Sequence, residues 1–186
     1  MGPGTLFSLL FCQLLFLASG DPVEAGEKNL TAAEPEDFSY LHVEYMLLQD
    51  KLCNKKWKSR GFYCYRYFDT PKTFSEAEDE CHSYGRDAHL TSISSHHDSV
   101  FLADLVEEAE NDVWVGLRNL EGCDSWTWTD GTPYNPDYAH WGAGQPDLCV
   151  VHPVCGQLMR SSKFYKWNDV DCSTRTGYIC ETPANH

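Results

Sequence analysis

Four oxygen-bearing side chains lie at the two ends of the stretch 141–169, which opens WGAGQPD and closes KWND. They are Gln145, Asp147, Asn168 and Asp169. Carboxylate and amide oxygens are the ligands that a hard cation such as calcium prefers. The alternative interpretation is structural, with a proline turn at one end and a polar turn at the other. Because both motifs occur together, we expect these side chains to hold one calcium ion.

The sequence lacks the motifs of common enzyme classes. It contains no G-x-S-x-G nucleophile elbow, no H-E-x-x-H zinc motif and no glycine-rich phosphate loop. His152 lies near Asp147, but a single histidine in an apolar loop lacks the partners that zinc binding or acid–base catalysis needs. His96 and His97 are adjacent in a predicted helix and therefore point in different directions. We expect no enzymatic activity.

The first 20 residues carry no charged side chain and contain an apolar run, residues 6–18, that ends in small side chains. This pattern is typical of a secretory signal peptide cleaved after Gly20. A membrane-spanning helix needs about 20 apolar residues, so an uncleaved anchor is the weaker alternative. No later apolar run is long enough to span a membrane. The sequence therefore predicts a secreted, extracellular protein without membrane insertion.

Residues 21–52 connect the predicted signal peptide to the rest of the chain. The part 21–37 is acidic and rich in alanine and proline, which predicts a flexible linker, and it carries a glycosylation sequon at Asn29. Apolar residues then recur at spacings of three and four and predict a short amphipathic helix over 38–51. This helix packs on its own domain or mediates self-association through residues 38–52, and the sequence leaves both open.

Cysteine count and charge set further limits. Removal of the signal peptide discards Cys12 and leaves eight cysteines in an exported chain. An even number in that setting predicts disulfides rather than metal thiolates, but eight cysteines allow 105 pairings and spacing alone does not choose among them. The formal net charge of -14 argues against a nucleic-acid partner, because phosphate binding requires clustered Lys and Arg.

From Cys53 onward the sequence becomes rich in aromatic residues and loops. Thr73 and Glu76 have the spacing of a capping box, which predicts the start of a first helix, and Ser94 or Ser95 caps a second. The inner face of the first helix is predicted to carry Phe74, Ala77, Cys81 and Tyr84. Short strands are predicted at 62–68, 113–117, 126–128, 150–151, 164–167 and 178–180. Two helices combined with short strands indicate an α+β domain.

Several motifs match one known family in order and spacing: Cys81 after the first helix, then AHLTSI, VWVGL, WTWTDG, WGAGQPD, KWNDVDC and YICE. On these motifs residues 53–182 resemble a C-type lectin-like domain with an N-terminal hairpin, followed by a tail at 183–186. The resemblance implies a disulfide-stapled α+β fold in which two helices flank small antiparallel sheets and a long loop carries the ligand site. It also implies the disulfides Cys53–Cys64, Cys81–Cys180 and Cys155–Cys172, which leaves Cys123 to pair with Cys149; Cys149 is the alternative partner of Cys172.

The resemblance implies a ligand as well as a fold. In lectins of this family the two motifs hold calcium, which implies Gln145, Asp147, Asn168 and Asp169 as ligands and a cis peptide bond before Pro146. The Gln-Pro-Asp order resembles that of galactose-type members and implies a preference for galactose or N-acetylgalactosamine. Pro153 stands where the family has a further acidic ligand, so we expect one weakly bound ion.

The loop 148–154, LCVVHPV, is apolar where the family tends to be glycine-rich and acidic. Cys149 stands where galactose binders usually have an aromatic ring, so Trp141 or Tyr138 would have to provide the surface on which a sugar stacks. An apolar, disulfide-held loop also suits a protein surface. The alternative function is therefore binding of an extracellular protein through this loop and His152. A third and more remote alternative is binding to a mineral or ice surface.

Overall fold

The computed structural model describes residues 53–122, 125–148 and 153–184, which all lie within one of two units of the chain, Phe38–His186. The predicted signal peptide, the segment 21–52 with its sequon and predicted helix, and the strand candidate at 150–151 lie outside the described residues. None of the helices in the described part of the chain combines the length and apolar character that crossing a membrane requires.

The strands and helices follow a fixed order along the chain. They are β1 (Lys58–Arg60), β2 (Tyr63–Lys72), α2 (Phe74–His82), β3 (His89–Leu90), α3 (His96–Leu105), β4 (Val113–Asn119), β5 (Trp126–Trp128), η1 (Pro136–Tyr138), β6 (Val154–Leu158), η2 (Arg160–Ser162), β7 (Trp167–Asp171) and β8 (Thr176–Pro183). The predicted first helix is α2 and the predicted second helix is α3, so the α+β class is confirmed.

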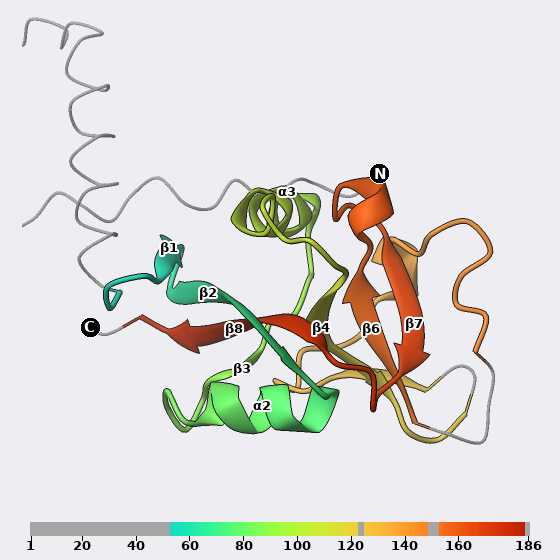
Figure 1. The fold of residues 1–186 in the computed structure, drawn as a ribbon, viewed down its shortest axis with the longest axis horizontal. Coiled ribbons are helices and arrows are strands. Elements are labelled where there is room, and N and C mark those ends of the chain that lie inside the picture. Colours follow the sequence, from blue (N-terminus) through green and yellow to red (C-terminus); the bar gives the residue numbers. More distant parts are fainter. Residues whose placement is uncertain (1–52, 123–124, 149–152, 185–186) are drawn as a thin grey trace, which may run out of the picture. The chain divides into compact units, whose positions relative to one another are not determined.

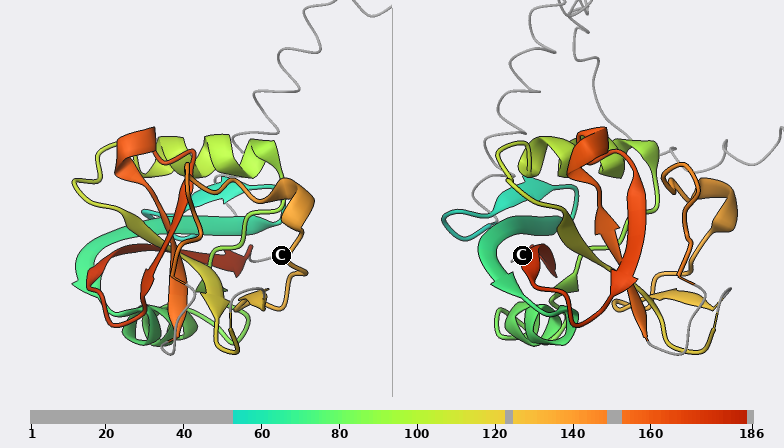
Figure 2. Two further views of the ribbon diagram at one scale, coloured as in Figure 1. Left: turned by 90° about the vertical axis from the view of Figure 1, so that its right-hand side faces the viewer. Right: turned by 45° about the vertical axis from the view of Figure 1, so that its right-hand side comes forward.

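The strands form one sheet (Figure 1). Six of them follow one another in the order β1-β2-β8-β4-β6-β7, while β3 pairs with β8 and β5 pairs with β4. The pairing of β4 with β8 is parallel and the others are antiparallel, so the sheet is mixed rather than purely antiparallel. Helices α2 and α3 lie on opposite sides of the sheet in both views of Figure 2.

The capping box fixes where α2 begins. The Thr73 hydroxyl accepts a hydrogen bond from the Glu76 backbone N–H, and the Glu76 carboxylate accepts one from the Thr73 N–H. This satisfies two of the N–H groups that a helix leaves without partners at its start. The helix buries Phe74, Ala77 and Cys81, as predicted. It ends at His82, however, so Tyr84 lies beyond it with 40% of its surface exposed, and the prediction for that residue was wrong.

Strand β4 passes close to the backbone of β3 at Gly116. The Gly116 N–H donates to the Thr91 carbonyl at 2.8 Å, and its carbonyl accepts from the Thr129 N–H at 2.9 Å. A Cβ atom at this position would lie 2.5 Å from the Leu90 carbonyl oxygen and 2.7 Å from the Thr129 hydroxyl. Such distances are far below van der Waals contact, so only glycine fits here.

Strand β7 begins later than predicted. The sequence predicts a strand over 164–167, but Phe164 has a positive φ of 66° in the turn after η2, and the strand is Trp167–Asp171. Asn168 and Asp169 consequently lie inside a strand that pairs with β6, opposite Gln157 and Gly156. The alternative interpretation of this motif as a polar turn is wrong.

Three disulfides connect described residues: Cys53–Cys64, Cys81–Cys180 and Cys155–Cys172. All three were predicted. The second closes the longest loop, with a sequence separation of 99, and ties α2 to β8. Cross-links that close long loops restrict the unfolded chain most. Cys123 and Cys149, the remaining predicted pair, lie outside the described residues.

Candidate calcium and ligand site

The WGAGQPD segment lies along the start of β7. The Trp167 N–H donates to the His140 carbonyl at 2.9 Å, and the Gly142 N–H donates to the Trp167 carbonyl at 2.8 Å. Trp141 forms an isolated parallel bridge with Trp167. These backbone contacts place the segment that carries Gln145 and Asp147 beside the strand that carries the other two predicted ligands.

Trp141 anchors this segment through its side chain. Its ring packs against those of Trp126, with centroids 4.7 Å apart, and Trp167, with centroids 5.7 Å apart. Its indole N–H donates to the Tyr134 hydroxyl at 3.1 Å. Buried tryptophans usually find a hydrogen-bond partner for this group. Trp141 and Tyr138 both pack against the main core cluster. That a sugar stacks on either ring stays a prediction.

Asp169 joins β7 to the predicted ligand loop. Its side chain is buried, with 2% of the residue exposed. One carboxylate oxygen accepts a hydrogen bond from the Asp147 N–H at 3.0 Å, and the other accepts one from the Leu148 N–H at 2.9 Å. Hydrogen bonds to an ionised carboxylate are stronger than neutral ones. Asp169 therefore fixes the loop backbone at the position of a second predicted ligand.

Gln145 has a buried side-chain oxygen without a partner. Among the described residues, three buried side-chain nitrogen or oxygen atoms lack a hydrogen bond: Gln145 Oε1, Arg118 Nε and Trp167 Nε1. Leaving a buried acceptor unsatisfied costs about 1–3 kcal/mol, so such an atom in a loop needs an explanation. The peptide bond from Gln145 to Pro146 is cis, as predicted.

The donor set fits a hard cation. Asp147 is exposed, Asn168 is half-buried beside Asp169, and the orphaned oxygen of Gln145 lies two residues before Asp147. A carboxylate has about four lone-pair positions, of which the loop N–H groups occupy two on Asp169. The other lone pairs are the ones that a metal ion would use. Two carboxylates and two amides are oxygen ligands of the kind that calcium takes.

The loop after Asp147 lacks one of the acidic ligands that the family resemblance implies. Pro153, which stands where a further acidic ligand is expected, is exposed and directly precedes β6. It offers no side-chain oxygen. Leu148 packs against the main core cluster, so the first apolar residue of the loop contributes to the interior. His152 and Cys149 lie outside the described residues.

Sequence reasoning missed the second role of Asp169. The residue was predicted as a metal ligand, but its partners are backbone N–H groups at positions 147 and 148. Every non-proline residue offers such a group, so no sequence pattern marks the contact. The one available signal was the acidic residue type at an inward-facing position of a strand, where a carboxylate requires partners.

A further buried acid, Glu181, lies in β8. Its carboxylate accepts a hydrogen bond from the Thr91 hydroxyl at 2.8 Å, and only 7% of the residue is exposed. Burial, with a smaller contribution from Asp130, raises the pKa of Glu181 from 4.5 to about 8, because the charged form is disfavoured away from water.

Known proteins resemble this chain in both sequence and structure. Residues 70–182 match the family model described as Lectin C-type domain. A "C-type lectin" from Micrurus corallinus is 35% identical over 69% of this chain and 82% of its own length. A "C-type lectin mannose-binding isoform" from Oxyuranus scutellatus is 32% identical over the same shares. Among solved structures, human lithostathine is 26% identical with a TM-score of 0.64, over 70% of this chain and 99% of that one.

Proposed function

Because the chain belongs to the C-type lectin domain family, we propose that it is a calcium-dependent carbohydrate-binding protein whose ligand loop lies beside β7. The proposed calcium ligands are Gln145, Asp147, Asn168 and Asp169. When bound, the ion would supply a positive centre on which sugar hydroxyls replace water. The predicted signal peptide and the disulfides support secretion, since disulfides persist in oxidising compartments.

The observation that carries this proposal is the buried Oε1 atom of Gln145, which has no hydrogen-bond partner. A cation bound at this oxygen would remove the cost of burying it. Asp169 also supports the proposal. Its carboxylate holds the loop backbone at Asp147, which lowers the entropy cost of ordering the loop when a ligand binds. Both features favour a loop organised before its ligand arrives.

The proposed site is weak. Four side chains and the Asp169 carbonyl supply fewer oxygens than the six to eight that calcium takes, because Pro153 provides no carboxylate. Water, or two neighbouring hydroxyls of a sugar, would complete the shell. We therefore expect a calcium dissociation constant of about 0.1–1 mM, in the range of extracellular modules.

The order of amide and acid around Pro146 determines the proposed sugar. Each sugar hydroxyl on the ion also bonds a side chain, as acceptor to an amide or as donor to a carboxylate. Gln145 and Asp147 place the amide first and the acid second, which favours galactose or N-acetylgalactosamine. One relative carries the word mannose-binding in its name, so both sugar types belong in the test.

A glycan array in calcium and in chelator tests the proposal. We expect galactose-terminated glycans to bind in calcium and to be lost in chelator. The double variant Gln145→Glu with Asp147→Asn exchanges the amide and the carboxylate on the two sides of Pro146. It should move binding toward mannose-terminated glycans.

The control for this exchange is the same swap at a second amide-Pro-acid triplet. Asn135 and Asp137 flank Pro136 in η1, and both are exposed. Asn135→Asp with Asp137→Asn should leave the glycan profile unchanged. An array on which the wild-type protein binds no glycan in either buffer would refute the lectin function in favour of the protein-binding alternative.

A further inference from the structure

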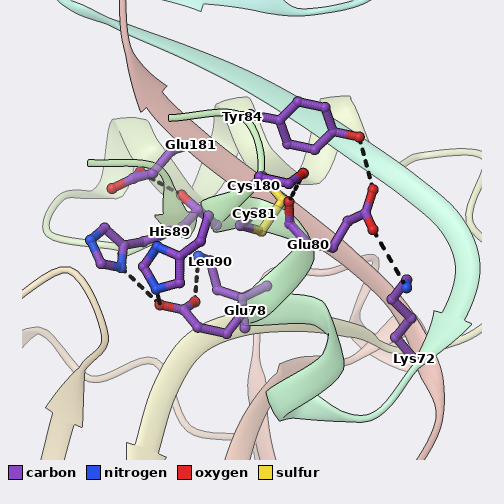
Figure 3. The surroundings of a disulfide bond; sticks show 12 residues. Lys72, Glu78, Glu80, Cys81, Tyr84, His89, Leu90, Cys180 and Glu181 are labelled. Atoms are coloured by element: carbon purple, nitrogen blue, oxygen red, sulfur yellow. Dashed lines mark hydrogen bonds and ion pairs between the residues drawn. A yellow bond between two sulfur atoms is a disulfide. The ribbon is translucent and has the colours of Figure 1, made fainter. Parts of the chain in front are cut away.

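A carboxylate and two imidazoles from α2 and β3 meet beside the Cys81–Cys180 disulfide (Figure 3). They belong to Glu78, His82 and His89, whose ligand atoms all lie within 4.8 Å of one another. We propose that these three side chains form a metal site for a transition-metal dication of the zinc class. None of the three takes part in the calcium site proposed above.

The ligand types select the metal. Imidazole nitrogens bind zinc, copper and nickel, whereas calcium takes oxygen ligands. Two histidines and one glutamate are a known zinc ligand set that leaves a fourth position for water. The His82 side chain is 42% exposed, so solvent reaches this position. The two proposed sites on this chain therefore differ in the metal each would take.

The spacing of the ligand atoms suits a small ion. Zinc bonds of about 2.0–2.2 Å in a tetrahedral arrangement place ligand atoms roughly 3.3 Å apart. Glu78 Oε1 lies 3.4 Å from His82 Nε2 and 2.8 Å from His89 Nδ1. The first distance already fits. The second is a hydrogen bond, and an ion that replaced the shared proton would hold these two atoms about 0.5 Å farther apart.

The second oxygen of Glu78 is held in place by the fold. Glu78 Oε2 accepts hydrogen bonds from the Leu90 N–H at 2.8 Å and the Thr129 hydroxyl at 3.2 Å. The other oxygen, Oε1, faces the imidazoles of His82 and His89. Figure 3 shows the Glu78 carboxylate between His89 and Leu90. Outer contacts of this kind orient a ligand and raise metal affinity. The carboxylate is therefore positioned before any ion binds.

The backbone around the three side chains is equally fixed. Glu78 and His82 are four residues apart on α2, a spacing that puts both on one face of the helix. His89 lies in β3, which pairs with β8, and the disulfide ties α2 to the same strand. The imidazole rings of His82 and His89 lie with centroids 4.6 Å apart. An ion at this site would cross-link α2 to the sheet.

Zinc titration of the full chain, stripped of metal with a chelator, tests the site. We expect one zinc ion per chain, a visible absorption band when cobalt replaces zinc, and a rise in melting temperature. At a free zinc concentration of 100 times the dissociation constant, the unfolding equilibrium constant should fall about 100-fold. His82→Ala should weaken zinc binding by at least about 10-fold, and this exposed side chain is removed without disturbing the core.

Two further variants test an outer contact of Glu78 and the difference between this site and other histidines. Thr129→Val removes one outer contact of Glu78 and should give a smaller loss than His82→Ala. His96→Ala with His97→Ala removes an exposed adjacent pair and should leave zinc affinity unchanged. The proposal is overturned if the wild-type chain binds no zinc saturably, if His82→Ala binds zinc as tightly as the wild type, or if the His96 and His97 variant loses the ion.

Discussion

Replacement of Asp169 by Asn, measured without calcium, should destabilise the protein. The Asp169 carboxylate accepts one backbone N–H with each of its oxygens, at 3.0 and 2.9 Å, in a buried position. Asparagine keeps one acceptor oxygen but turns an amide group toward the second N–H. One hydrogen bond is lost, and two donors then face each other.

The expected loss follows from the strength of such bonds. A hydrogen bond to a charged group contributes about 1.5–3 kcal/mol to the free energy of unfolding. The N–H left without an acceptor adds a desolvation cost, although solvent at the loop relieves part of it. We therefore expect Asp169→Asn to lower the free energy of unfolding by about 2–3 kcal/mol, which corresponds to a fall in melting temperature of about 5–10 °C.

Urea unfolding in chelator, with the disulfides intact, measures this loss. Asp147→Asn is the matched control, because it makes the same chemical change at an exposed side chain whose backbone N–H remains. It should change the free energy of unfolding by less than about 0.5 kcal/mol. Equal stability of the two variants in chelator would refute the role of Asp169 in holding the loop.

Two further predictions concern the sheet. Burial raises the pKa of Glu181 from 4.5 to about 8 in the folded protein, so the contribution of this carboxyl group to stability is greatest below pH 4.5 and is lost as the pH rises through 8. The free energy of unfolding of the wild type should therefore fall relative to that of Glu181→Gln by up to about 5 kcal/mol over that range, and parallel pH profiles of the two proteins in urea unfolding would contradict the assignment. Gly116→Ala should cost about 2–3 kcal/mol in thermal unfolding, because its Cβ would meet the Leu90 carbonyl at 2.5 Å. Gly85→Ala, whose Cβ would lie at ordinary contact distance from the Thr182 hydroxyl (3.5 Å) and the Ala88 Cβ (4.0 Å), should cost little, and equal costs would show that the close contact at Gly116 relaxes.

Local sequence patterns predicted the elements whose causes are local. The start of α2 depends on Thr73 and Glu76, which are three residues apart, and both were identified. The three described disulfides followed from the family resemblance rather than from the spacing of cysteines. The end of α2 and the start of β7 were placed wrongly, because aromatic residues such as Tyr84 and Phe164 fit a helix face or a strand by pattern alone.

The chemistry of the two candidate sites was predictable to different degrees. The proposed calcium ligands stand in two short motifs, so the residue types suggested them directly. The group at Glu78, by contrast, depends on β3 pairing with β8, which brings His89 to α2. A sequence reveals the four-residue spacing of Glu78 and His82 but not the strand register that completes the group. Long-range pairing is the information that local patterns lack.

Calcium titration of the wild-type chain by calorimetry tests the central claim most directly. We predict one calcium ion per chain with a dissociation constant of about 0.1–1 mM, and loss of that binding in Asp147→Asn and in Gln145→Ala. Neither substitution removes a described hydrogen bond of the fold, so a folded variant that fails to bind reports on the site itself. The absence of saturable binding in the wild type, or unchanged binding in both variants, would contradict the proposed site.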